Sequence, residues 1–125
     1  MNIITLINTA KIFNKFAQTK VSSRLAYKIM KFYKSVAVEE EFYNTKRNEL
    51  INMYATRDES GNIAVDDQGM ICIIPDKINE ANMALQELNS IEVETPNIKF
   101  TLSELDELQL SVADMFALDE FIEEE

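Results

Sequence analysis

Apolar residues recur at helical spacing through the first 55 positions. Between Ile3 and Ala17 they lie three or four positions apart, which predicts a first helix. A second apolar stripe starts at Val21 and predicts a helix that ends near Ala55, about 50 Å long if it is continuous. The charge changes sign near residues 38–41, so a break there is the alternative to one continuous helix.

The middle of the chain changes to turn residues and short apolar runs. Residues 63–65 and 70–74 flank a four-residue connection that ends in Gly69, which predicts an antiparallel hairpin. Pro75 ends the second strand, and Asp76 is placed to N-cap a short helix. We find no internal repeat in this region.

The last third of the chain predicts one more strand and one more helix. Residues 91–95 alternate between apolar and acidic types, and Pro96 interrupts a strand that resumes over 98–100. Ser111 and Asp114 have capping-box spacing, so a last helix is expected to run to about Ile122. Together these elements predict one α+β domain over residues 1–125. It is mostly helical, with long N-terminal helices, a small antiparallel sheet (the hairpin plus one strand) and a C-terminal helix.

The composition excludes several classes of chemistry. The chain has no histidine, which is the commonest general base and metal ligand, and a single cysteine, Cys72. We therefore predict no cofactor, no metal site and no enzymatic activity. No apolar run approaches the ~18 residues of a membrane span, and one cysteine allows no internal disulfide, so a cytoplasmic location is expected.

The net charge of −10 conceals a strong asymmetry. Residues 1–38 contain seven basic residues and no acidic one, whereas residues 58–125 contain eighteen acidic residues and two basic ones. On the second helix, five cations form what we call the basic stripe: Lys20, Arg24, Lys28, Lys31 and Lys34. The stripe could follow a phosphate backbone, or it could be a solvated face or pair with the chain's own acidic half. The net charge favours the second interpretation, so free nucleic acid is not expected as the main partner.

The acidic half offers two candidate binding surfaces. The predicted acidic surface consists of Glu92, Glu94, Glu104, Asp106, Glu107, Asp114, Asp119 and Glu120. The last predicted helix also carries an apolar face with Met115, Phe116, Phe121 and Ile122. That face either packs on the long helix or docks into a partner.

Four aspartates near the hairpin present a further choice between two interpretations. Carboxylate oxygens are hard ligands that suit a divalent cation, but the spacing and the closing glutamate of a calcium loop are missing. We therefore interpret them as turn residues. The four are Asp58, Asp66, Asp67 and Asp76.

Several short motifs occur in a familiar order. They are Ala26-Tyr27-Lys28-Ile29, Arg47-Asn48-Glu49-Leu50-Ile51, Asp58-Glu59-x-Gly61-Asn62, Leu88-Asn89-Ser90-Ile91-Glu92-Val93-Glu94, Leu102-Ser103-Glu104-Leu105, Leu110-Ser111-x-Ala113-Asp114 and Leu118-Asp119-x-Phe121-Ile122-Glu123-Glu124. Over residues 21–124 the chain resembles a family of small uncharacterised proteins from bacteriophages and prophages of Gram-positive bacteria. The resemblance implies a phage origin and action in the bacterial host, and it carries over no catalytic residue.

These observations lead to one functional hypothesis and one alternative. The hypothesis is a phage-encoded, non-enzymatic protein that inhibits a host defence or nucleic-acid-handling protein, its acidic surface occupying a cationic groove. The alternative is a virion-assembly or structural accessory protein, in which oppositely charged faces let copies stack into a homo-oligomer or dock on a phage protein. In both cases the partner is a protein, not a membrane.

Overall fold

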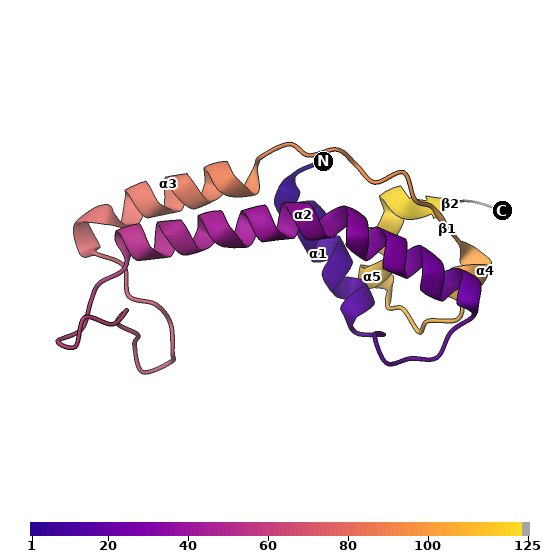
Figure 1. Ribbon diagram of the computed structural model, residues 1–125, viewed down its shortest axis with the longest axis horizontal. Coiled ribbons are helices and arrows are strands. Elements are labelled where there is room, and N and C mark those ends of the chain that lie inside the picture. Colours follow the sequence, from indigo (N-terminus) through magenta and orange to yellow (C-terminus); the bar gives the residue numbers. More distant parts are fainter. Residues whose placement is uncertain (124–125) are drawn as a thin grey trace. The chain divides into compact units, whose positions relative to one another are not determined.

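The computed structural model describes residues 1–123, which are mostly helical with one very small sheet, as the sequence predicts (Figure 1). The helices are α1 (Ile3–Asn14), α2 (Ser23–Tyr54), α3 (Ile78–Asn89), α4 (Leu102–Leu105) and α5 (Val112–Leu118). Two 3₁₀ turns, η1 (Pro75–Lys77) and η2 (Asp119–Phe121), and two strands, β1 (Phe100–Thr101) and β2 (Ile122–Glu123), complete the list.

The chain divides into two compact units. Unit 1 contains Met1–Glu40 and the chain from Glu92 onward, and unit 2 contains Glu41–Ile91. Helix α2 contributes residues to both units. The expectation of a single domain over residues 1–125 stays a prediction.

Helix α2 is continuous over 32 residues, so the alternative of a break near residues 38–41 is wrong. The chain's two glycines and two prolines all lie outside this segment, and the glutamates that change the sign of the charge are good helix formers. Ser22 caps the helix, because its Oγ accepts the Leu25 backbone N–H at 3.2 Å.

The core of unit 1 is a cluster of four phenylalanines, each from a different element. Phe13 of α1 lies 5.5 Å from Phe32 of α2 and 5.0 Å from Phe100 of β1, measured between ring centroids. Phe121 of η2 meets Phe32 at 5.0 Å with the rings nearly perpendicular. All four side chains are fully buried, so α1, α2 and the C-terminal segment close a common core.

The one sheet in the described residues differs from the predicted antiparallel sheet. Strand β1 pairs with β2 in parallel, with Phe100 opposite Ile122 and Thr101 opposite Glu123. Residues 91–95 form no named strand, and their one bridge joins Glu92 to Asn2. The prediction was wrong because two-residue strands carry no alternation that could reveal their pairing.

The predicted hairpin is present only as isolated antiparallel bridges, which join Ala55 to Ile73, Arg57 to Ile63 and Val65 to Ile71. The backbone between α2 and η1 forms a ring of three hydrogen bonds. The Thr56 N–H donates to the Cys72 carbonyl at 2.8 Å, Cys72 N–H to Ala64 at 3.0 Å, and Ala64 N–H to Thr56 at 2.8 Å. Three short segments therefore hold one another, and no continuous ladder forms.

Two equivalent turns connect these three segments. Asp58 Oδ1 accepts the N–H groups of residues 60 and 62 at 2.9 and 3.0 Å, and Asp66 Oδ1 accepts those of residues 68 and 70, both at 2.9 Å. Gly61 and Gly69 follow at the same offset with φ of 82° and 78°, a region that favours glycine. The segment thus contains an eight-residue repeat, so the prediction of no repeat is wrong. Three of the four aspartates, Asp58, Asp66 and Asp67, are turn residues as interpreted, whereas Asp76 lies in η1.

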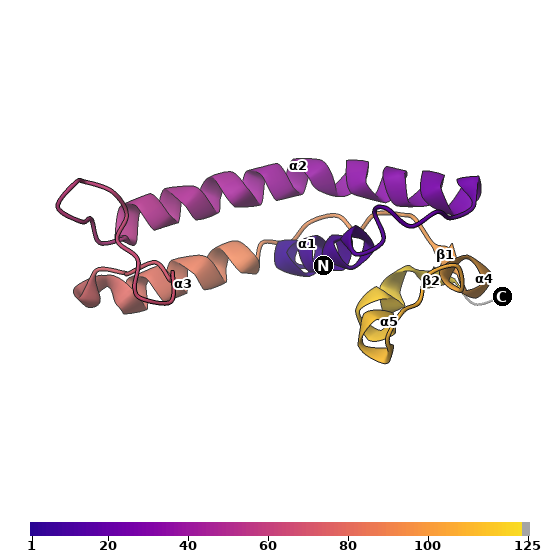
Figure 2. The ribbon, with the colours of Figure 1, turned by 90° about the horizontal axis from the view of Figure 1, so that it is seen from below.

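Unit 2 is a helical hairpin whose two helices are connected through residues 55–74, which we call the looped segment, and η1. The C-terminal part of α2 and helix α3 run antiparallel and side by side (Figures 1 and 2). Tyr43 and Leu88 are buried in it, and Tyr43 Oη donates a hydrogen bond to Asn89 Oδ1 at 2.6 Å. Asp76 does not N-cap α3 as predicted, because it lies inside η1 and the N-cap position falls on Lys77.

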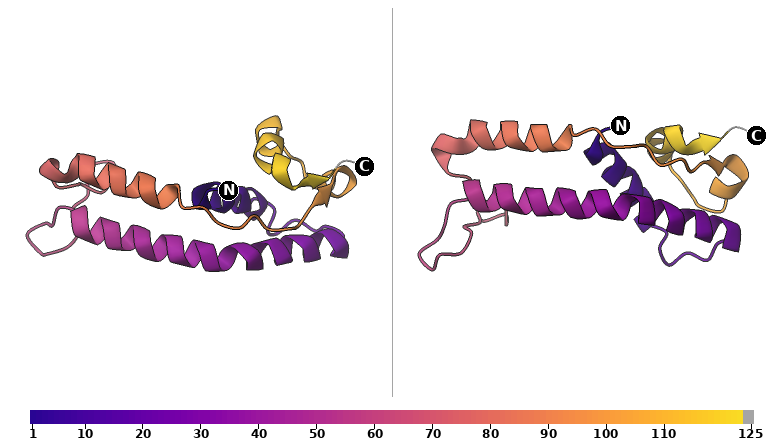
Figure 3. Two further views of the ribbon diagram at one scale, coloured as in Figure 1. Left: turned by 90° about the horizontal axis from the view of Figure 1, so that it is seen from above. Right: turned by 45° about the horizontal axis from the view of Figure 1, so that its top comes forward.

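The C-terminal region keeps the predicted cap but not the predicted helix length. Ser111 and Asp114 form the expected capping box, whereas α5 ends at Leu118 and continues as η2 and β2 (Figure 3). A second capping box, between Thr101 and Glu104, starts α4. Its T-x-x-E spacing is readable in the sequence, and we did not predict it.

Candidate protein-binding surface

Glu104, predicted as part of the acidic surface, is buried inside unit 1. Its Oε1 accepts hydrogen bonds from Lys28 Nζ at 2.7 Å and from the Thr101 N–H at 2.9 Å. Burial alone raises the pKa of this carboxyl, but the bonds from Lys28 and Thr101 outweigh it, so the net pKa lies below the ordinary value. Lys28 also donates to the Lys99 carbonyl at 2.8 Å, which ties α2 to the segment before β1.

Asp114 makes the equivalent connection to α1. Its Oδ1 accepts a hydrogen bond from Lys15 Nζ at 2.9 Å, and its Oδ2 accepts the Ser111 N–H at 3.2 Å. These two interactions, with Lys15 the larger, lower the pKa of the Asp114 carboxyl. We call the Lys28–Glu104 and Lys15–Asp114 pairs the acid clamps of unit 1.

Two of the residues predicted to form the acidic surface belong to the acid clamps, so their prediction as binding residues was wrong. Glu104 and Asp114 are 7% and 9% exposed and hold the fold together, so they cannot present charge to a partner. The other six carboxylates of the predicted acidic surface are exposed: Glu92, Glu94, Asp106, Glu107, Asp119 and Glu120. Glu92 pairs with the N-terminal amine at 3.0 Å, and Glu107 accepts two hydrogen bonds from Ser22. Their role in binding stays a prediction.

The basic stripe is not a row of equivalent free cations. Lys28 is half-buried against Glu104, and Lys31 lies 5.4 Å from the ring centroid of Tyr27. Lys20, Arg24 and Lys34 are exposed. The interpretation in which the stripe pairs with the chain's own acidic half therefore holds for one of its members.

The predicted apolar face of the last helix is also divided. Phe121 belongs to the phenylalanine core, whereas Phe116 on α5 is 79% exposed. Met115 and Ile122 are half-buried, and Ile122 lies in β2 and not on a helix. The four residues cannot act as one docking face, because the helix that would align them ends at Leu118.

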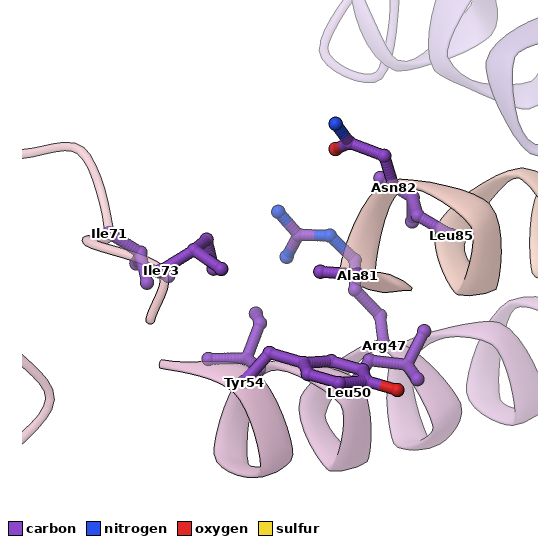
Figure 4. Close-up of a pocket in the computed structure, with 9 residues that line it drawn as sticks. Arg47, Leu50, Tyr54, Ile71, Ile73, Ala81, Asn82 and Leu85 are labelled. Carbon is purple, nitrogen blue, oxygen red and sulfur yellow. The ribbon is translucent and has the colours of Figure 1, made fainter. Parts of the chain in front are cut away.

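Unit 2 contains an open apolar pocket of about 200 Å³, which we call the hairpin pocket (Figure 4). It lies where the looped segment meets the two helices, and Figure 4 shows Ile71 and Ile73 facing residues from α2 and α3. Its lining residues are Arg47, Leu50, Ile51, Tyr54, Ile71, Ile73, Ala81, Asn82 and Leu85.

Two polar side chains define the chemistry of the hairpin pocket. Tyr54 Oη donates to Glu80 Oε1 at 3.3 Å, and burial together with this carboxylate raises the pKa of the phenol. Tyr54 therefore stays protonated and holds its ring in place as part of the wall. Within residues 1–123, Arg47 has no carboxylate within 4.0 Å, so its guanidinium can donate to a ligand.

A second depression, the hairpin groove, has a volume of about 420 Å³. Leu50 lines both depressions, so they flank the line along which α2 meets α3. Much of the groove's apolar lining is open, including Met53 at 63% and Phe42 at 41% exposure. Its lining residues are Phe42, Lys46, Glu49, Leu50, Met53, Ala84, Glu87, Leu88 and Ile91.

Neither depression was predicted from the sequence. A signal was present, because residues 42, 46, 50 and 53 have helical spacing on α2 and residues 84 and 88 have it on α3. Of the groove residues on α2, only Leu50 belongs to the apolar stripe from which this helix was predicted.

Two further observations bear on chemistry and location. Among residues 1–123, no three His, Cys, Asp or Glu side chains come together as a possible metal site. No helix in the same residues is long and apolar enough to cross a membrane.

Comparison with known proteins gives no assignment. No protein-family model, curated protein or solved structure matches the chain. The case for a function therefore depends on the surfaces of the molecule itself.

Proposed function

We propose that this chain functions as a binding protein, and that its partner is a protein that inserts an apolar side chain into the hairpin pocket. The observation that carries the proposal is the pocket itself, an open apolar depression lined from α2, α3 and the looped segment and containing the Arg47 guanidinium. Its volume of about 200 Å³ lies below the range typical of small-molecule sites. A single anchoring side chain of a protein suits this size.

The chemistry of the pocket indicates what the partner presents. Leucine and isoleucine walls suit an aliphatic or aromatic anchor. Arg47 offers hydrogen bonds to an acceptor beside that anchor, such as a main-chain carbonyl. The net charge of −10 steers the chain toward basic proteins, in line with the inhibitor hypothesis.

The phage resemblance implies a partner from the bacterial host, so a host lysate is the proper source for a test. Immobilised wild-type protein should capture a host protein that is lost with Ala81→Phe, which fills the pocket, and with Arg47→Glu, which reverses its charge. Met83→Glu is the matched control, because Met83 lies on the same helix, is 70% exposed and does not line the pocket.

The expected result is a captured protein that binds wild type and Met83→Glu equally but binds both pocket variants at least tenfold more weakly, as judged by titration calorimetry. Circular dichroism should show the same helical signal in all four proteins. Capture profiles that are identical for all four would contradict the proposal. So would turnover in a broad substrate screen that one carboxylate substitution abolishes.

A further inference from the structure

We propose that the hairpin groove binds a second copy of this chain, so that two helical hairpins associate as a four-helix bundle about a twofold axis. The hairpin groove lies on the other side of the α2–α3 contact from the hairpin pocket, so this inference goes beyond the proposed function. The two share only Leu50 among their lining residues.

The first argument is the extent of uncovered apolar surface. On α2 the lining runs from Phe42 to Met53, eleven positions, or about 17 Å at the rise of an α-helix. On the other side the lining includes buried Leu88 of α3 and continues past the end of that helix to Ile91, which is 37% exposed. Such a long strip suits the side of another helix better than a single anchoring side chain.

The second argument is architectural. Two antiparallel helices form one layer, and burying their apolar stripes on this side requires another layer of similar length. A second copy supplies two helices of matching length and spacing, which completes a four-helix bundle. A twofold axis is the commonest way for identical chains to associate, because one patch then serves both copies.

The third argument is the distribution of charge. Helix α3 carries Glu80 and Glu87 and no basic residue, whereas the part of α2 in unit 2 carries Lys46 and Arg47 as well as Glu41 and Glu49. Lys46 and Glu87 lie on opposite sides of the groove. When α2 of one copy packs on α3 of the other, Lys46 approaches the partner's Glu87, and the twofold axis repeats this pair.

The groove of one copy has a net charge of −1, much less than the −10 of the whole chain. The groove is lined by one cation and two anions, Lys46, Glu49 and Glu87, and Lys46 already pairs with Glu49 at 3.3 Å. Four of the unit's carboxylates lie instead in the looped segment, at Asp58, Glu59, Asp66 and Asp67. The one unlike pair across the groove, Lys46 on α2 and Glu87 on α3, therefore favours a second copy whose α3 packs antiparallel to α2.

Analytical ultracentrifugation of the full chain tests the proposal. Up to about 200 μM, the wild type should change from 14.4 kDa to twice that mass with one dissociation constant. Met53→Glu and Phe42→Glu each place a charge in the interface and should weaken dimerisation by at least ~30-fold. Met83→Glu, outside the groove, should leave the constant unchanged. A wild type that stays monomeric overturns the inference, and so does a dimer that both groove variants retain.

A charge exchange tests the predicted register. Lys46→Glu and Glu87→Lys should each weaken self-association by about fivefold, the size typical of a rim ion pair. Mixing the two variants should produce a heterodimer that is tighter than either homodimer, because each α2–α3 pair again has unlike charges. Failure of the mixture to associate more tightly overturns the register. Because none of Phe42, Lys46, Met53 and Glu87 lines the hairpin pocket, these variants leave the host-capture test unaffected.

Discussion

The two units of this chain bury their apolar side chains to different extents. Unit 1 brings four phenylalanines from four elements into one fully buried cluster. Unit 2 buries Tyr43, Tyr54 and Leu88 between two helices and leaves Met53 and Met83 largely exposed. Helix α2 contributes to both, so the helical stripe alone does not decide whether a side chain is buried. The number of layers around it decides that.

The largest expected effect is a cavity in unit 1. Phe32→Ala removes a ring that contacts three other phenylalanines and should lower the free energy of unfolding by about 3–5 kcal/mol. Phe42→Ala, on the same helix but 41% exposed in unit 2, should cost less than about 1.5 kcal/mol. Urea denaturation of both variants measures the difference, and equal costs would show that unit 2 is as well packed as unit 1.

The next effect concerns the acid clamps, which only unit 1 has. Glu104→Gln weakens the acceptor for Lys28 and Thr101 and should lower the free energy of unfolding by about 1–3 kcal/mol at neutral pH. Glu107→Gln is the matched control, since Glu107 is exposed and three positions further along. It should cost no more than about 1 kcal/mol, the usual value for a surface interaction. If Glu107→Gln lowers the free energy of unfolding as much as Glu104→Gln does, the Glu104 clamp stabilises the fold no more than a surface interaction does.

The clamps also predict how stability depends on pH. The carboxyls of Glu104 and Asp114 have lower pKa values in the folded chain than in the unfolded chain. As the pH falls, the unfolded chain therefore binds protons first. The stability from both clamps is complete above about pH 5, where the carboxyls of the unfolded chain are ionised, and is lost as the pH falls through the lower pKa values of the folded chain. Urea midpoints across this range should fall steeply for wild type and less steeply for Glu104→Gln with Asp114→Asn; parallel curves would contradict the assignment.

The smallest effect is expected in the looped segment of unit 2. The Cβ that Gly61→Ala or Gly69→Ala adds has no atom within 4 Å. Each substitution should therefore lower the free energy of unfolding only by the strain of a positive φ, about 1 kcal/mol. The readout is hydrogen exchange at the amides of Thr56, Ala64 and Cys72, which should accelerate about fivefold while unit 1 amides are unchanged. Equal acceleration in both units would mean that they unfold as one.

Local sequence signals predicted the helices well. Helix α2 extends over 32 residues without glycine or proline. The capping box of Ser111 and Asp114 provides hydrogen-bond acceptors for backbone N–H groups at the start of α5. Both features depend on residues only a few positions apart. The Asp58 and Asp66 turns are equally local, and their eight-residue period could have been found by aligning the segment with itself.

The clamps and the parallel strands could not be predicted in this way. Lys28 is 76 positions from Glu104, and Lys15 is 99 positions from Asp114, so many other lysines were equally eligible partners. The pairing of β1 with β2 adds to the closure of the phenylalanine core around Phe100 and Phe121, and no pattern within two residues encodes it. The same limit explains why Glu104 was assigned to the surface, since a carboxylate becomes buried only where a distant cation meets it.

At one end of unit 2, the backbone conformation depends on few side chains, because a ring of three backbone hydrogen bonds holds it together. Its two turns depend on Asp58 with Gly61 and Asp66 with Gly69. In the described part of the chain, the side chains between each pair, at residues 59–60 and 67–68, donate and accept no hydrogen bonds. These four positions can diversify freely while the backbone around them is inherited unchanged, so this tip can evolve new contacts faster than the rest of the molecule.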